Sequence, residues 1–167
     1  MGGRGASSGA KRVDISLKSG IIESGSEGMF RKKNPEKIEP MPKKQLRKIE
    51  SAFKRQGGII QMNQATDEYL ETKHAEGITY DSKTVLLRQN PGRASVFEEM
   101  IHTAQYRDGK NDGTRKSTLL NEIEAQRKLI KNAGAYKLTP PEIRQTERAL
   151  AMYLRKLNEY NKTHGGG

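Results

Sequence analysis

The stretch SVFEEMIHTAQYRDG, residues 95–109, places two glutamates and a histidine on one short amphipathic segment. Glu98 and His102 are four residues apart, and Glu99 lies at the edge of the same face. Two side chains one helical turn apart can hold one metal ion. The adjacent face is apolar at helical spacing and is formed by Val96, Phe97, Met100, Ile101 and Ala104. The stretch therefore predicts a core-facing helix with a candidate metal site beside its apolar face.

The same helix also has an ordinary interpretation. Ser95 suits an N-cap position, and Glu98 then stands at N3, where its carboxylate completes a capping box. Surface helices that carry acidic residues and one histidine are common. The motif alone leaves both interpretations open.

A second helical segment, TLLNEIEAQRKLIKNAG at 118–134, adds a carboxylate from elsewhere in the chain. Glu122 and Gln126 fall inside its predicted buried arc, whereas Glu124 points away from it. The arc itself consists of Leu119, Ile123, Leu129, Ile130 and Ala133. A buried carboxylate is costly unless it is paired or bound to a cation. Glu122 therefore requires a partner, and either His102 or a metal ion would serve.

The remaining sequence predicts one small α+β domain, with a short antiparallel sheet and the E-E-x-x-H helix packed on further helices. The chain has 167 residues, of which 32% are hydrophobic, enough for one modest core. Helical spacing before Gly57 predicts a first helix, and GIIQMN at 58–63 predicts a short strand. A helix over 64–75, a β-hairpin over 77–88 that turns at 81–83, and three further helices follow. The last helix opens at Thr139.

The expected domain covers residues 43–162, between a basic N-terminal arm at 1–42 and a disordered tail at 163–167. Because the arm has little apolar periodicity, we expect it to be flexible and its removal to leave the melting temperature nearly unchanged. The net charge of +11, concentrated partly at 31–48, favours nucleic acid or acidic protein surfaces as partners of this arm. The sequence has neither cysteine, nor a membrane-spanning stretch, nor the apolar middle of a secretory signal, and we expect a soluble protein.

The order of a strand pair, an E-E-x-x-H helix, a loop and a helix that contributes a glutamate resembles the zincin metallopeptidases of the Glu-ligand type. Residues 44–160, with the GGRGASSG leader, look more narrowly like the zincin-like domains at the C-termini of phage minor head proteins and prophage toxins. The resemblance implies a peptidase acting on a protein or peptide, with Glu99 as the general base that activates water. It also implies that Glu98, His102 and Glu122 bind zinc.

The sequence departs from that family at one ligand, because Glu98 stands where the first histidine is expected. One histidine and two glutamates form an oxygen-rich set, which favours zinc less and tolerates manganese or magnesium better. Three interpretations follow: a metallopeptidase with an altered ligand set, a zincin-like fold that has lost its metal, or a buried Glu–His cluster that organises the core. A basic binding module for nucleic acid or a phage head is the alternative from another class.

Overall fold

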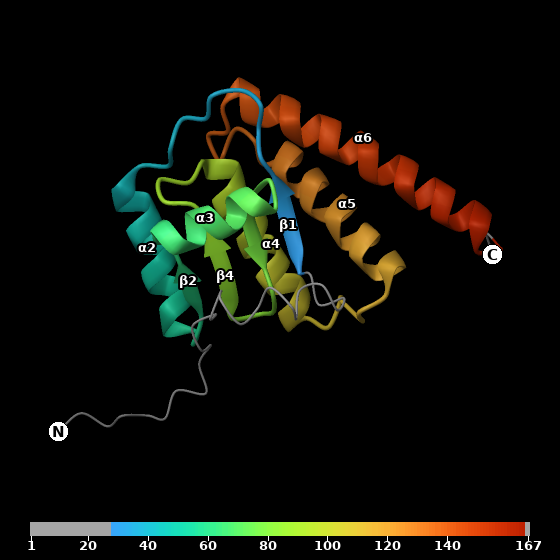
Figure 1. The fold of residues 1–167 in the computed structure, drawn as a ribbon, viewed down its shortest axis with the longest axis horizontal. Coiled ribbons are helices and arrows are strands. Elements are labelled where there is room, and N and C mark those ends of the chain that lie inside the picture. The colour runs from blue at the N-terminus through green and yellow to red at the C-terminus, as the bar shows by residue number, and fades with distance from the viewer. Residues whose placement is uncertain (1–27, 166–167) are drawn as a thin grey trace.

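In the computed structural model, which describes residues 28–165, the chain forms a four-stranded sheet covered by helices (Figure 1). The α+β class expected from the sequence is confirmed. The strands are β1 (Met29–Lys32), β2 (Ile59–Gln61), β3 (Ala75–Thr79) and β4 (Thr84–Leu87). The helices are α2 (Lys43–Arg55), α3 (Gln64–Thr72), α4 (Arg93–Arg107), α5 (Arg115–Lys131) and α6 (Pro140–Thr163).

The sheet has the strand order β1-β3-β4-β2. The hairpin predicted from the sequence is present, and it joins the antiparallel strands β3 and β4. β1 is antiparallel to β3, but β2 runs parallel to β4. The sheet is therefore mixed, and the expectation of an antiparallel sheet is wrong at this edge. The cause is α3, which connects β2 to β3 and lets β2 pair with the second strand of the hairpin.

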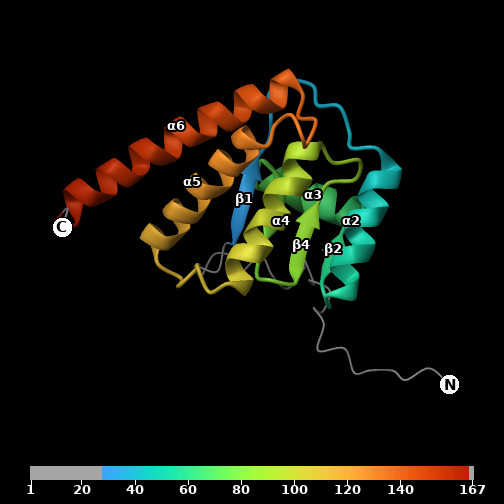
Figure 2. The same ribbon diagram turned by 180° about the vertical axis from the view of Figure 1, so that it is seen from behind.

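Helices cover both faces of the sheet (Figures 1 and 2). On one face α3 packs Tyr69 and Leu70 against β3 and β4. On the other face α2 and α4 pack Phe53 and Val96 against β2 and β4. α5 and α6 pack against each other beyond α4 and β1, and the last turns of α6 extend past the body of the domain (Figure 1). The two helices that carry the candidate site, α4 and α5, therefore lie between the sheet and α6.

Local sequence signals account for most of these elements. α2 ends as expected before Gly57, and a Cβ on Gly58 would lie 2.5 Å from atoms of the Phe53 ring, so the turn requires glycine there. α6 begins at a capping box in which Thr139 and Glu142 exchange hydrogen bonds. Within residues 28–165, no helix combines the length and the apolarity that a membrane crossing requires.

α4 begins earlier than the sequence suggested. Its N-cap is Gly92 and its first residue is Arg93, so Ser95 already lies inside the first turn. Glu98 is consequently beyond the N3 position, and the expected capping box of Ser95 and Glu98 does not form. The carboxylate of Glu98 is bonded instead by Arg31 and Gln126. Glu98 thus belongs to the buried side of α4 and not to its cap.

The N-terminal boundary also differs from the expectation. Residues 1–27, including the VDISLKSGII segment, lie outside the described residues, but 28–42 are ordered and contain β1. Met29 and Arg31 point to the same side of the sheet, and their exposed fractions are 1% and 4%. This segment therefore belongs to the domain rather than to a flexible arm. At the other end α6 reaches Thr163, where the tail was expected to begin.

Candidate metal centre

Three side chains that are distant in sequence converge between α4 and α5. Nε2 of His102 lies 2.7 Å from Oε1 of Glu122 and 3.6 Å from Oε1 of Glu98. One potential ligand atom from each residue lies within 4.8 Å of the other two. All three side chains are buried. The residues singled out from the sequence as metal ligands thus form one compact cluster, because the i, i+4 pair on α4 faces the buried arc of α5.

His102 and Glu122 contain polar atoms with no hydrogen-bond partner. Nε2 and Oε1 are close, yet their alignment satisfies no hydrogen bond, and neither atom has another partner within the described part of the chain. Most buried polar groups are hydrogen-bonded, so two adjacent exceptions need an explanation. Lone pairs directed at a shared third point, the arrangement of metal ligands, would explain both.

Neighbouring side chains fix the orientation of these two residues. Nδ1 of His102 lies 2.7 Å from Oε1 of Gln105, whose own amide donates to the backbone oxygen of Asn121. A partner on Nδ1 leaves Nε2 directed at the cluster, as is usual for metal-binding histidines. The hydroxyl of Tyr153 on α6 donates to Oε2 of Glu122 over 2.8 Å, which leaves Oε1 facing His102.

Glu98 is held by two other residues. Nη1 of Arg31 is 2.9 Å from its Oε2, and Nε2 of Gln126 donates to its Oε1 over 2.6 Å. Arg31 is itself anchored by a 2.9 Å hydrogen bond to Oγ1 of Thr146. No local pattern indicates Arg31 as a partner of Glu98, because the two residues lie 67 positions apart in the chain. Of the three candidate metal ligands, Glu98 is therefore the one whose carboxylate oxygens are most engaged by other side chains.

Glu99 lies on the side of α4 that faces the sheet. The hydroxyl of Thr79 on β3 donates to its Oε1 over 2.8 Å, whereas Oε2 has no hydrogen-bond partner in the described structure. A Cβ on Gly77 would lie 2.9 Å from Cδ2 of Leu87 and 3.1 Å from Oε2 of Glu99, so a larger residue at this position would force one of these side chains to shift. Glu99 is thus positioned beside the three candidate ligands but is not among the residues whose donor atoms converge.

The charges of the cluster perturb its titration. Burial opposes ionisation of Glu98, but the charges of Arg31 and His102 outweigh it and lower the pKa of Glu98 to about 2. Burial and the charge of Glu98 raise the pKa of Glu99 well above its ordinary value. Burial disfavours the charged form of His102, but the carboxylate of Glu122 prevails and raises the pKa of His102.

The donor set fits a divalent cation. Two donors at about 2.0–2.2 Å from one ion stand at most about 4.4 Å apart, and both distances from His102 Nε2 meet this limit. The buried carboxylates of Glu98, Glu99 and Glu122 face one buried guanidinium, that of Arg31. A divalent cation would neutralise the remaining charge, and so would protons on His102 and Glu99. The oxygen-rich donors suit manganese or magnesium as well as zinc.

In the metal-free protein, stability should depend on pH through Glu99. Its pKa is raised on folding from an ordinary value of 4.5, so its contribution is fully present below pH 4.5 and is lost as pH rises through the folded pKa. Glu99→Gln removes this loss. In EDTA, thermal unfolding should show the variant gaining stability over the parent between pH 5 and pH 8. A difference between the two proteins that does not change with pH would contradict the raised pKa.

No protein-family model matches this chain, and no curated protein or solved structure matches it either.

Proposed function

We propose that this domain is a metal-dependent, zincin-like peptidase of phage or prophage origin. The observation that carries the proposal is the convergence of Glu98, His102 and Glu122 on one buried point, where Nε2 of His102 and Oε1 of Glu122 lack hydrogen-bond partners. Glu98 would bind the same ion through Oε1. This oxygen accepts one hydrogen bond from Gln126 and can accept a further contact.

Glu99 is assigned as the general base. A bound divalent cation supplies Lewis acidity towards a peptide carbonyl and lowers the pKa of water. Glu99 accepts and returns the proton, and a free Oε2 together with a raised pKa suits that role near neutral pH. Thr79 holds the other carboxylate oxygen, so the rotamer of Glu99 is fixed before substrate arrives.

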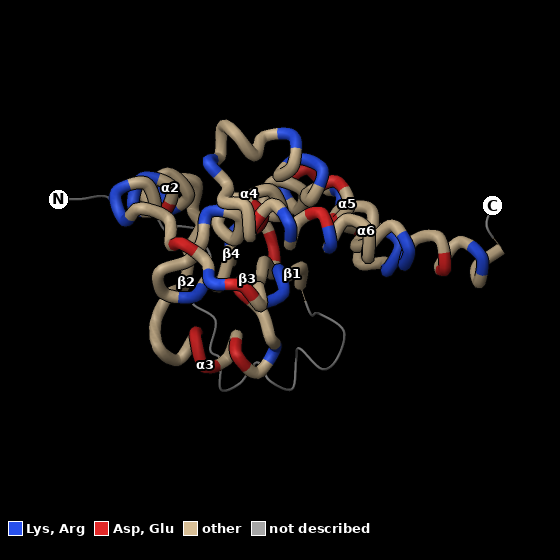
Figure 3. Tube along the Cα trace, turned by 90° about the horizontal axis from the view of Figure 1, so that it is seen from above, with Lys and Arg blue, Asp and Glu red and all other residues tan. Residues whose placement is uncertain are grey.

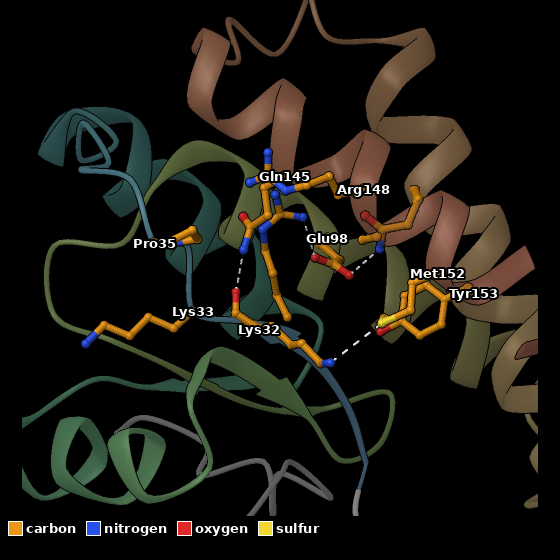
Figure 4. Close-up of a pocket in the computed structure, with 11 residues that line it drawn as sticks. Lys32, Lys33, Pro35, Glu98, Gln145, Arg148, Met152 and Tyr153 are labelled. Atoms are coloured by element: carbon orange, nitrogen blue, oxygen red, sulfur yellow. Dashed lines mark hydrogen bonds and ion pairs between the residues drawn. The ribbon is translucent and has the colours of Figure 1, made fainter. Parts of the chain in front are cut away.

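Substrate would approach from the side of β1 and α6. A pocket of about 190 Å³ opens there, and Glu98, Gln126 and Tyr153 are among the residues that line it (Figure 4). Gln126 and Tyr153 bond the ligands Glu98 and Glu122 directly. Of the candidate metal ligands, Glu98 lines this pocket itself, while His102 and Glu122 are not among its lining residues.

The decisive experiment is a metal measurement on the purified full-length protein. After dialysis with zinc or manganese, mass spectrometry should find about one ion per chain, because a three-donor site takes one metal. His102→Ala should lower metal affinity by more than the about 10–100-fold that loss of an outer-shell partner costs. It should also cost about 3–5 kcal/mol of stability in EDTA, because the buried carboxylate of Glu122 loses its ion-pair partner and keeps only the hydrogen bond from Tyr153.

His74→Ala is the matched control for metal binding, since His74 is exposed and is not among the residues whose donor atoms converge. It should leave the metal content unchanged. A parent protein that binds none of zinc, manganese or magnesium would refute the metal site.

A catalytically inactive zincin-like fold is the second candidate, and Arg31 favours it. Its guanidinium already occupies Oε2 of Glu98, so the cluster has a cation of its own. Buried polar clusters of this kind can serve to specify a unique packing arrangement. A protein that binds no metal and hydrolyses no peptide would favour this candidate, whereas chelator-sensitive hydrolysis would exclude it.

Nucleic-acid binding is a third candidate. The surface that suits it is α2 rather than the N-terminal segment. Within residues 28–42, Arg31 is buried against Glu98 and Lys33 bonds Glu71. α2 instead presents a row of exposed cations that have no ion-pair partner in the described residues: Lys44, Arg47, Lys48 and Arg55 (Figure 3). If each of these four cations contacts a phosphate, affinity for a duplex should fall by about 10²-fold between 50 and 200 mM salt. Salt-independent binding, or none, would remove this candidate.

A further inference from the structure

The pocket beside β1 has a strongly asymmetric charge. Arg31, Lys32, Lys33 and Arg148 line it, whereas Glu98 is its one carboxylate among the described residues. Glu98 is already bonded by Arg31 and Gln126, and Lys33 is paired with Glu71. The positive charges that remain at the pocket are those of Lys32 and Arg148.

Lys32 and Arg148 have no carboxylate partner in residues 28–165. The only bond of the Lys32 amine is a weak one to Sδ of Met152 over 3.6 Å. Arg148 lies near Glu36, but that carboxylate forms its ion pair with Arg144 at 2.7 Å. In Figure 4 these two exposed cations flank the buried Glu98. Two unpaired cations at one opening form a site for an anionic group.

The inner end of the pocket offers a different kind of contact. Oε1 of Gln126 is buried and has no hydrogen-bond partner in the described structure, while the amide nitrogen of the same side chain is committed to Glu98. A free carbonyl oxygen accepts an N–H or O–H donor. Pro35, Ala149 and Met152 supply apolar surface at the same pocket. The pocket thus combines an acceptor, an apolar wall and cations.

These features fit a peptide that carries an acidic side chain. The backbone N–H of a peptide satisfies the acceptor of Gln126, and the aliphatic stem of the side chain contacts Met152. Its carboxylate pairs with one of the two free cations at the opening, Lys32 or Arg148. A nucleic-acid backbone suits the pocket less, because its phosphates require cations in a row, as on α2. An isolated pocket of about 190 Å³ with two free cations suits a single charged group better.

We propose that this pocket is a substrate subsite that selects a glutamate or aspartate residue in the peptide to be cleaved. The proposal rests on the proposed function, since it assigns the substrate preference of the same site. It predicts that removing either unpaired cation weakens the preference for an acidic residue without changing the metal centre.

Binding of two labelled peptides that differ in one residue tests this directly. The probes are fluorescent Ala-Ala-Glu-Ala-Ala and Ala-Ala-Gln-Ala-Ala, measured by anisotropy at low salt with the full-length Glu99→Gln protein, which does not cleave them. The glutamate peptide should bind about tenfold more tightly. Lys32→Gln and Arg148→Gln should each reduce that ratio towards one. Arg47→Gln, which removes the same charge from α2, should leave the ratio unchanged.

The outcomes separate this inference from the proposed function. Equal binding of the two peptides, or equal effects of Arg47→Gln and Arg148→Gln, would overturn the acidic subsite. A labelled oligonucleotide whose binding depends on Arg148 while neither peptide is preferred would also overturn it. A glutamate preference that depends on Arg148 supports the subsite even if the parent binds no metal, and that result would refute the peptidase alone. Metal binding and hydrolysis without a preference would refute the subsite alone.

Discussion

Glu99→Gln should abolish peptide hydrolysis while leaving metal content and fold intact. Glutamine keeps the size of the side chain and its acceptor for Thr79, but it cannot take a proton. Removal of a general base lowers turnover by about 10²–10⁴-fold. The measurement is the rate of cleavage of a peptide library by the zinc- or manganese-loaded protein, with metal content determined on the same samples.

Glu124→Gln provides the matched control for this experiment. Glu124 lies on α5 near the candidate ligands, but its carboxylate bonds Gln105 and Lys110 and is partly exposed. Its replacement should leave turnover within a few-fold of the parent. If Glu99→Gln retains metal and cleaves as fast as the parent, Glu99 is not the base. If it loses metal, Glu99 is a ligand and the assigned roles on α4 must change.

Removal of residues 1–40 should destabilise the domain severely. The deletion eliminates β1 and with it the buried side chain of Met29, a loss of about 2–5 kcal/mol for a side chain of this size. It also leaves Glu98 buried without Arg31, which costs about 3–5 kcal/mol. The sum is comparable to the whole stability of a typical domain, about 5–15 kcal/mol. Urea unfolding of the truncated chain would measure the loss.

Two point variants identify the cause. Arg31→Met should reproduce a large part of the loss, because it removes the buried partner of Glu98 but preserves the strand. Lys33→Met, two residues along, removes only an exposed ion pair with Glu71 and should leave the stability nearly unchanged. A truncated chain with the melting temperature of the parent would show that β1 contributes little, as the sequence alone suggested.

Local patterns predicted the elements that depend on local interactions. The apolar spacing of Leu46, Ile49 and Phe53 predicts α2, and the alternation around the turn at 81–83 predicts the hairpin. β1 was not predicted, because four residues carry too little periodicity and the strand is stabilised by pairing with β3 and by Arg31. The parallel pairing of β2 with β4 likewise depends on the path of α3, which no local pattern encodes.

The same distinction applies to the candidate site. Glu98 and His102 are neighbours on one helix, and Glu122 was recognisable as a carboxylate on an apolar arc, so their proximity followed from periodicity. Arg31 and Thr79 lie on strands, and their contacts with α4 arise only when the sheet packs against that helix. The burial of Glu98 was not predicted, because the sequence suggested that α4 begins at Ser95. A capping role at the helix terminus then accounted for the carboxylate of Glu98.

The hydrogen bond between Arg31 and Thr146 connects residues that are 115 positions apart, and it joins the first described strand to the last helix. Closing so long a segment costs chain entropy before any contact compensates for it, and folds rich in such contacts form slowly. During synthesis, Arg31 and Glu98 emerge well before Thr146 and Tyr153, which complete their surroundings. We therefore expect the ion pair and the metal site to mature after translation of α6, so that a ribosome-stalled fragment ending in α5 would acquire neither.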